Sequence, residues 1–142
     1  MPVLENARRA IETARLVLGL TEPGPVIIHR GPRGELHCDI PLMYQGFALD
    51  RIHYDPWRNM PLPKGAPHIV GKVGEPEILL ENLRGIVSEL RVLDAAEFRG
   101  PERAWAVPVA WKTLLVAYIK IDEKGEEVVP DYPLTDEVMR RV

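Results

Sequence analysis

Apolar residues recur at three- and four-residue steps in the first part of the chain, the spacing that puts side chains on one face of a helix. The stripe consists of Leu4, Ala7, Ile11, Ala14 and Leu18. Gly19 follows it directly, and a glycine after the last apolar position is typical of a helix end. The pattern therefore predicts a helix over residues 3–18, followed by a turn over residues 21–25.

Three stretches rich in β-branched and aromatic residues come next and predict three strands. They are residues 26–30, 35–44 and 47–55. A Gly-Pro-Arg-Gly loop separates the first two, and the Gln45-Gly46 pair is typical of a tight turn between the last two. Pro41 cannot donate to a strand ladder, so it marks an edge or a bulge in the second strand.

Residues 56–74 hold four prolines within their first twelve positions. A loop this long is uncommon inside a compact domain and is often functional when it occurs. We favour the simpler interpretation, a rigid segment that crosses one end of the sheet, because connecting segments usually run over the surface.

A second helix is predicted over residues 75–90, with Pro76 in its first turn. Its spacing of apolar residues again indicates a helix with one buried stripe. The stripe consists of Leu79, Leu83, Ile86 and Leu90.

The last third of the chain predicts further strands and a short terminal helix. The strands lie near Val92-Leu93 and over residues 102–111, 112–122 and 126–132. Thr135 is expected to cap the helix, with Asp136 and Glu137 in its first turn and Arg140 and Arg141 in its last.

The order of these elements is α-βββ-α-βββ-α, in a chain of 142 residues that has the size of one domain. Consecutive hairpins imply antiparallel pairing. We therefore expect an α+β fold, in which an antiparallel sheet of about five to six strands has helices packed on one face. The other face is left to water, a ligand or a second subunit.

The amino-acid composition and the net charge exclude several classes of protein. Apolar residues make up 46% of the chain and charged residues 27%, as in ordinary globular proteins. The net charge of −3 argues against nonspecific nucleic-acid binding, which needs a basic face. The single cysteine excludes an internal disulfide, and the charged first residues lack the apolar core of a signal peptide. The longest apolar run, residues 114–119, is too short to span a bilayer.

We therefore expect a soluble cytoplasmic protein with no membrane partner. Asparagine and glutamine together number four, and many of the 14 prolines lie in expected loops. Few thermolabile amides and proline-rich loops suggest a thermophilic source.

Three of the four histidines and the single cysteine lie within residues 26–55, where two His-x-Asp triplets begin at His37 and His53. Together the triplets could supply four ligands to a metal. If Gln45-Gly46 is a two-residue turn, however, Cys38 lies opposite His53. His37 and His53 then fall on opposite faces, so this register disfavours a joint metal site.

The same register suggests a different cluster. If Arg30 lies opposite Glu35, then His29, Cys38 and His53 share one face. A thiolate beside an imidazole could act as a nucleophile, and a cysteine with two histidines could bind zinc. The alternative is that Cys38 is a small buried apolar residue and that the histidines simply end strands. No spacing typical of a metal site is present, and the sequence names no cofactor.

Two basic loops are candidate ligand-binding sites. Arg30 and Arg33 lie on the glycine-containing loop of residues 29–34, and Lys64 lies in a Pro-Lys-Gly segment. Guanidinium groups and free backbone amides could hold a phosphate or a carboxylate. The alternative is a solvated hairpin tip whose arginines pair with Glu35 and its neighbours.

The strand over residues 102–111 alternates large and small side chains. One face carries tryptophan and valine and is expected to be core, while three alanines on the other permit close approach by a helix or a second subunit. Pro108 implies that this strand is an edge or is bulged. We expect a homodimer near this strand, because two-fold dimers are the commonest oligomers.

No motif of kinases, P-loops, Rossmann nucleotide sites, zincins or α/β-hydrolases is present. The leading hypothesis is a non-catalytic binding or assembly protein that holds a small anionic ligand or a protein partner. Arg30, Arg33 and Lys64 would be its ligand-facing charges. The alternative is an enzyme, a metal- or cysteine-dependent hydrolase or transferase built around His29, Cys38 and His53.

Overall fold

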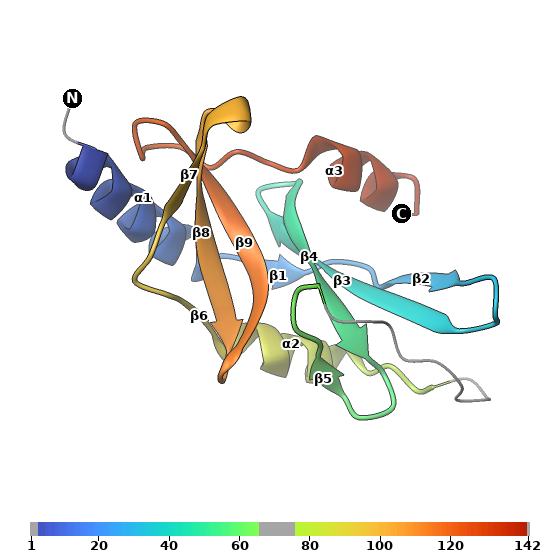
Figure 1. Cartoon of the computed structure of the whole chain (residues 1–142). Coiled ribbons are helices and arrows are strands. Elements are labelled where there is room, and N and C mark those ends of the chain that lie inside the picture. The colour runs from blue at the N-terminus through green and yellow to red at the C-terminus, as the bar shows by residue number, and fades with distance from the viewer. Residues whose placement is uncertain (1–2, 66–75, 142) are drawn as a thin grey trace.

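The computed structural model describes residues 3–65 and 76–141, which form three helices and two antiparallel sheets (Figure 1). The helices are α1 (Val3–Leu18), α2 (Leu80–Ser88) and α3 (Tyr132–Met139), with a short 3-10 turn over Gly100–Glu102. The first sheet contains β1 (Glu22–Pro23), β2 (Ile27–Arg30), β3 (Leu36–Tyr44), β4 (Phe47–Asp55) and β5 (Met60–Pro61). The second contains β6 (Leu90–Val92), β7 (Glu97–Arg99), β8 (Ala104–Trp111) and β9 (Leu114–Asp122). The predicted α+β class is confirmed, although the strands are divided between two sheets.

Most predicted elements are found near their expected bounds, and α1 matches its prediction at both ends. In contrast, α2 begins at Leu80, because Leu79 before it has extended backbone. Pro76 therefore lies outside the helix, and Leu79, which was predicted to be buried, is exposed. In the predicted long loop, β5 pairs with the end of β4, while residues 66–74 lie outside the described ranges.

Pro41 and Pro108 occupy equivalent places in the two sheets. Along one edge of β3, β2 pairs with residues 36–39 and β1 with residues 42–43, so that Pro41 falls between them. Along one edge of β8, β7 and β6 leave the same gap at Pro108. Each strand also has a bulge nearby and a full partner on its other edge. The predicted bulge near Pro108 is confirmed, and the alternative of an edge strand is wrong.

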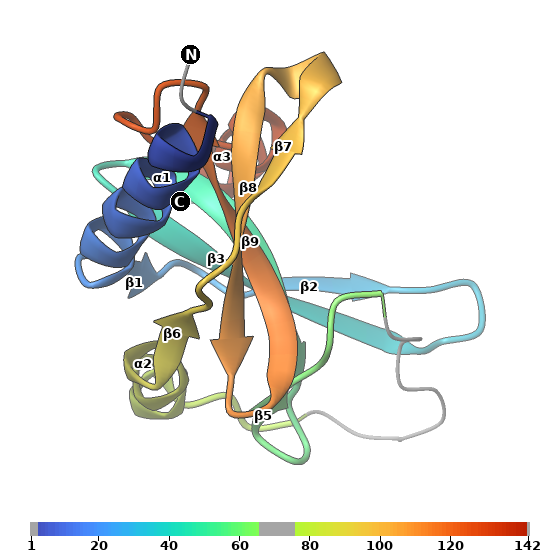
Figure 2. The ribbon, with the colours of Figure 1, turned by 60° about the vertical axis from the view of Figure 1, so that its left-hand side comes forward.

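One hydrophobic core is shared by both sheets, α1 and α2, and it includes the tryptophan–valine face of β8 (Figures 1 and 2). The terminal helix α3 covers a smaller cluster made by Ile27, Ala48, Leu134 and Val138. Ile27 pairs with Asp39 and Ala48 with Met43, which places this cluster on the other face of the first sheet. The helices therefore lie on two faces of this sheet instead of one.

The end of the chain differs from its prediction. Residues 126–132 form no strand beyond an isolated bridge at Val128, and β7 was not predicted. Asp131, not Thr135, caps α3, with its side chain accepting the Leu134 N–H at 3.0 Å. Thr135 is buried inside the helix, where its hydroxyl accepts the Ala48 N–H at 2.9 Å.

Within the described residues, no helix has the length and the apolar character needed to cross a membrane. The alanine face of β8 lies on the side where Arg99, Tyr118 and Lys120 project from the paired strands. Side chains of this sheet therefore cover the alanines. A homodimer, a thermophilic source and a cytoplasmic location stay predictions.

Candidate functional site

The β3–β4 hairpin has the predicted turn but not the predicted register. Gln45 and Gly46 both have positive φ, 49° and 83°, and Tyr44 pairs with Phe47. A bulge then leaves Leu49 without a partner, and beyond it every pair is shifted by one residue. The extra residue lets Leu49 stay buried while the rest of β4 keeps its apolar side chains in the core.

As a result, Cys38 lies opposite Tyr54, and His53 lies opposite Asp39. The predicted pairing of Cys38 with His53 is wrong. Because residues two apart in a strand share a face, His37 and His53 now lie on the same side of the sheet. The predicted separation of these two histidines is therefore also wrong.

The β2–β3 hairpin is shifted by one residue as well. Arg30 pairs with Leu36, and not with Glu35, because the loop closes through the Gly31 N–H, which donates to the Glu35 carbonyl at 2.8 Å. His29 consequently lies opposite His37. The two corrections together place His29 and His53 on one face and Cys38 on the other, so the predicted convergence of the three side chains does not occur.

Cys38 belongs to the hydrophobic core, where it is only 3% exposed. Burial, with the nearby charges of Asp39 and Asp55, raises the pKa of the Cys38 thiol to about 11. A thiol of this kind is a poor nucleophile at neutral pH. The structure therefore favours the alternative interpretation of Cys38 as a small core residue.

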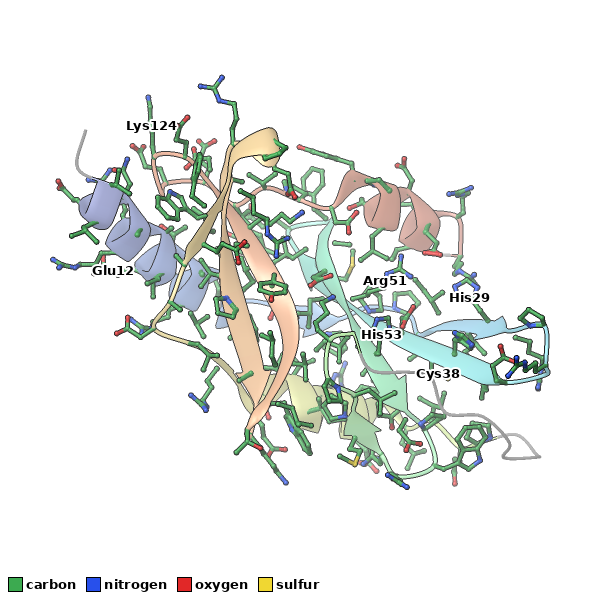
Figure 3. All side chains as sticks on the ribbon, in the orientation of Figure 1. Glu12, His29, Cys38, Arg51, His53 and Lys124 are labelled. Atoms are coloured by element: carbon green, nitrogen blue, oxygen red, sulfur yellow. The ribbon has the colours of Figure 1, made fainter. Side chains whose placement is uncertain are left out.

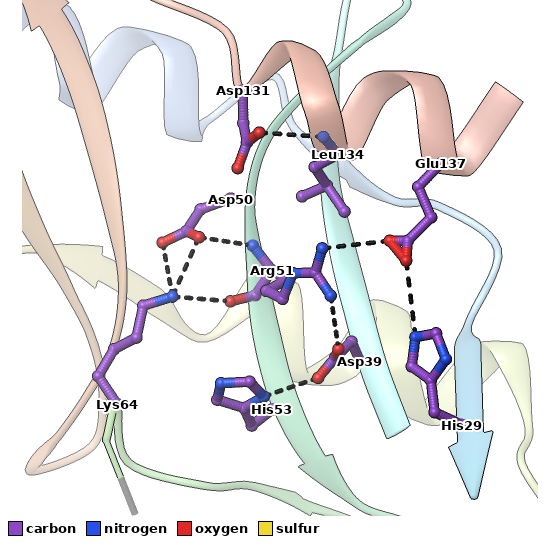
Figure 4. Close-up of polar contacts among 9 residues, drawn as sticks. All are labelled: His29, Asp39, Asp50, Arg51, His53, Lys64, Asp131, Leu134 and Glu137. Atoms are coloured by element: carbon purple, nitrogen blue, oxygen red, sulfur yellow. Dashed lines mark hydrogen bonds and ion pairs between the residues drawn. The ribbon is translucent and has the colours of Figure 1, made fainter. Parts of the chain in front are cut away.

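Asp39 lies at the centre of a charged network on the histidine face (Figure 4). One of its carboxylate oxygens accepts a hydrogen bond from Arg51 at 2.9 Å, and the other lies 2.7 Å from His53 Nδ1. Burial alone would raise the pKa of Asp39, but these two hydrogen bonds outweigh it and hold the pKa below its ordinary value. Asp39 is thus an ionised carboxylate that fixes the orientation of the His53 ring.

The network continues to the terminal helix. Glu137 of α3 accepts a hydrogen bond from Arg51 at 3.1 Å, and its other carboxylate oxygen lies 3.6 Å from His29 Nε2. Figure 3 shows Arg51 and His29 on the side of the sheet that faces α3. Sequence reasoning missed Arg51 and Glu137, because only the bulge and the docking of α3 bring them together.

An Asp–His pair can serve as an acid–base group, but its surroundings offer little else for catalysis. The sequence has a single serine, Ser88, which lies in α2 and donates to the Gly85 carbonyl. Among the described residues, no group of three or more His, Cys, Asp or Glu could hold a metal ion. His29, Cys38 and His53 line none of four cavities, of about 370 to 670 Å³, that the described residues form.

The predicted ligand-facing charges lie at two separate places. Lys64 bonds with both carboxylate oxygens of Asp50, at 3.0 and 2.9 Å, and also donates to the Arg51 carbonyl (Figure 4). Arg30 and Arg33 are exposed at the β2–β3 tip, where the Glu35 carboxylate accepts the Arg33 backbone N–H at 2.9 Å. These three cations do not form one site.

A cavity of about 670 Å³ opens instead between the end of α1, β1, α2 and β6. Leu18, Val87 and Leu90 give it an apolar floor. Three arginines line it, Arg15 from α1, Arg84 from α2 and Arg91 from β6, together with the hydroxyls of Thr21 and Ser88. We call this cavity the arginine groove.

The positive charge of the arginine groove is poorly compensated. Its only acidic lining residue is Glu22. Arg15 lies 3.8 Å from the exposed carboxylate of Asp94, Arg91 donates to a backbone carbonyl, and Arg84 makes no ion pair or hydrogen bond with any described residue. The lining residues therefore include three arginines and one carboxylate, with the exposed carboxylate of Asp94 beside Arg15.

A second cavity, of about 610 Å³, has equal numbers of positive and negative side chains. It is lined by Lys64, Arg99 and Lys120, and by three carboxylates, those of Asp50, Glu102 and Asp131. Here Lys64 is paired with Asp50 and Lys120 with Glu102. Its charges are thus neutralised internally, unlike those of the arginine groove, which is the larger of these two cavities.

Sequence reasoning missed the arginine groove because Arg15 lies far along the chain from Arg84 and Arg91, and only the fold brings α1 beside β6. Each arginine looks like an ordinary surface charge in its own element. Comparison of the chain with protein-family models, with curated proteins and with solved structures found no match. The functional argument therefore rests on the geometry and the charge of the described residues.

Proposed function

We propose that this protein is a non-catalytic binding protein that holds a small anionic ligand in the arginine groove. The observation that supports this proposal is the charge of the groove, whose lining holds three arginines and only the carboxylate of Glu22, with Asp94 pairing with Arg15 from outside the lining. Guanidinium groups bind phosphates and carboxylates through paired hydrogen bonds, which are strengthened by charge. A concave site with an apolar floor and a few polar groups is the usual form of a small-molecule site.

The expected ligand combines an anionic group with an apolar part. Arg84 and Arg91 would bind the anion from α2 and β6, and Arg15 would approach it from the end of α1. The apolar part would contact Leu18 and Val87. The lining hydroxyls of Thr21 and Ser88 already donate to backbone carbonyls, so they would serve the ligand as acceptors only.

The test is calorimetric titration of the protein with inorganic phosphate at low ionic strength. An ion this small should bind with a dissociation constant of about 1 mM, since few atoms make contact. Arg84→Gln removes one guanidinium without emptying the site, and should weaken binding by roughly tenfold, the value of one charged hydrogen bond.

Arg33→Gln is the matched control, because it removes an exposed arginine at the other candidate site. It should leave phosphate binding unchanged. Equal weakening by both variants, or no binding to the wild type at concentrations up to about 50 mM, would contradict the proposal. Weakening by Arg33→Gln alone would move the ligand to the β2–β3 tip.

An enzyme built on the histidine face is the second candidate function. The hydrogen bond that joins His53 to Asp39 at 2.7 Å favours it, because an oriented imidazole is the usual proton carrier in enzymes. Bound zinc in the purified protein would support this candidate over the binding protein.

A further inference from the structure

The chain contains two units of the same topology. Each unit consists of a helix, two short strands and a long hairpin, so that α1 and β1–β4 form the first unit and α2 and β6–β9 form the second. In both units the two short strands pair with the same edge of the first hairpin strand. Few residues of the two hairpins are identical, so the repeat is seen in the strand pairing and not in the sequence.

The two hairpins match position by position. The proline of the first hairpin strand, the turn residue with positive φ and the unpaired residue of the bulge all recur at the same places. The pairs are Pro41 and Pro108, Gln45 and Lys112, and Leu49 and Val116, which all differ by 67 in residue number. The two units are therefore built on one plan.

The two units are related by an approximate two-fold axis. β4 lies beside its equivalent β9, while α1 packs against β6 and α2 packs against β1. Each unit thus contacts the other through the same elements, as a two-fold relation requires. Such an axis gives each position in one unit an equivalent position in the other, on the opposite side of the axis.

The arginine groove lies on this axis. Figure 2 shows the end of α1, β1, β6 and α2 on one side of the molecule, where the groove opens. Its lining holds six residues from each unit, and each residue of the first unit has a counterpart 69 positions later in the second. The pairs that carry charge or form the floor are Arg15 and Arg84, Leu18 and Val87, and Glu22 and Arg91.

Arg15 and Arg84 therefore line the groove on opposite sides of the axis. Arg84 makes no ion pair or hydrogen bond with any described residue. Arg15 lies 3.8 Å from Asp94, but the Asp94 side chain is 88% exposed, and exposed ion pairs contribute little. At about 670 Å³ the groove has the size of cavities that hold drug-sized ligands, so it has room for more than a single phosphate.

We propose that the ligand carries two anionic groups joined by an apolar link, as in a linear dicarboxylate or bisphosphate. This inference rests on the proposed function and names the class of ligand. Arg84 and Arg91 bind one anionic group, and Arg15, the equivalent of Arg84, binds the other. Leu18 and Val87 contact the link between the two groups.

The experiment is calorimetric titration of the full chain at low ionic strength with three kinds of ligand. They are inorganic phosphate, butylphosphonate, and bisphosphonates with methylene chains of increasing length. Once one phosphonate is bound, the second binds within the same complex, so the best bisphosphonate should bind about tenfold more tightly than butylphosphonate. Butylphosphonate is the matched ligand, because it has the apolar chain but only one anionic group.

Variants of the chain then locate the second group. Arg15→Gln should weaken the best bisphosphonate about tenfold but phosphate only about twofold, because Arg84 and Arg91 remain. Asp94→Asn releases Arg15 from its ion pair and should tighten the same bisphosphonate about twofold, a gain that misfolding cannot produce. Arg8→Gln is the matched control, because it removes an exposed arginine of α1 that does not line the groove.

The outcomes separate this inference from the proposed function. Phosphate binding that depends on Arg84, with no bisphosphonate tighter than butylphosphonate, would overturn the two-group ligand and leave the anion site in place. Equal weakening of the bisphosphonate by Arg15→Gln and Arg8→Gln would also overturn it. If none of the three kinds of ligand binds, the proposed function fails together with this inference.

Discussion

At the residue scale, local pairing decides which side chains can act together. Leu49, the unpaired residue of the β4 bulge, moves His53 to the face away from Cys38 and sets it opposite Asp39. The sequence predicts the Gln45-Gly46 turn well, because two residues with positive φ are what that pair permits. It does not predict the bulge, because Leu42 and Leu49 are apolar in either register and the choice depends on packing.

Cys38 should react slowly with thiol reagents in the folded protein. With a pKa of about 11 and 3% exposure, it is mostly a protonated, inaccessible thiol at pH 8. We expect alkylation at least about a hundredfold slower than in the same protein unfolded in urea. Rapid alkylation under native conditions would contradict this placement of Cys38.

The raised pKa of Cys38 also determines how the free energy of unfolding changes with pH. The folded state holds this proton more tightly than a free cysteine of ordinary pKa 9.0 does. Its contribution to stability is therefore complete below about pH 9 and is lost as the pH rises toward about 11.

At the scale of elements, periodicity predicts long amphipathic segments and fails on short ones. The whole of α1 follows from its apolar stripe, because that stripe is buried along its length. In contrast, β7 is three residues long and has no detectable period. Residues 126–132 contain Val128 and Val129 and suggest a strand, but they lead the chain to α3 instead.

Replacing Gly85 should stabilise α2. Gly85 lies in the middle of this helix, and a Cβ atom added there would meet nothing within 4 Å. Because glycine costs more backbone entropy than alanine, Gly85→Ala should raise the free energy of unfolding by about 0.5–1 kcal/mol in urea titration.

Gly125 provides the opposite control. It has a φ of +80°, and a Cβ atom there would lie 2.7 Å from the Asn6 carbonyl oxygen and 2.8 Å from the Ala10 nitrogen. Gly125→Ala should therefore lower the free energy of unfolding. Equal effects of the two substitutions would show that the packing between α1 and the loop at Gly125 is described wrongly.

At the scale of the whole molecule, a side chain and a loop join the two sheets where β4 and β9 lie side by side. Asp50 of β4 accepts the Tyr118 N–H of β9 at 2.8 Å, and the Lys64 N–H donates to the Leu115 carbonyl at 2.8 Å. A division into two sheets was not predictable from hairpins alone, because this junction depends on contacts between residues far apart in the sequence.

Asp50→Ala should therefore destabilise the whole fold. The substitution removes the acceptor of the Tyr118 N–H and the counter-charge of the partly buried Lys64 ammonium, which keeps only the Arg51 carbonyl, at a cost of about 2–4 kcal/mol in urea titration. Glu123→Ala removes an exposed ion pair with Arg103 and should change stability by less than about 1 kcal/mol. A similarly small effect of Asp50→Ala would mean that Asp50 does not hold the sheets together.

The central claim is that a small anion binds between α1, α2 and β6. The most direct measurement follows the side-chain Nε–Hε signals of the arginines by NMR during titration with inorganic phosphate. We expect the signals of Arg15, Arg84 and Arg91 to shift together along one binding curve, while those of Arg30 and Arg33 stay in place. Shifts that are largest at Arg30 and Arg33, or that are small and uniform over all arginines, would contradict the claim.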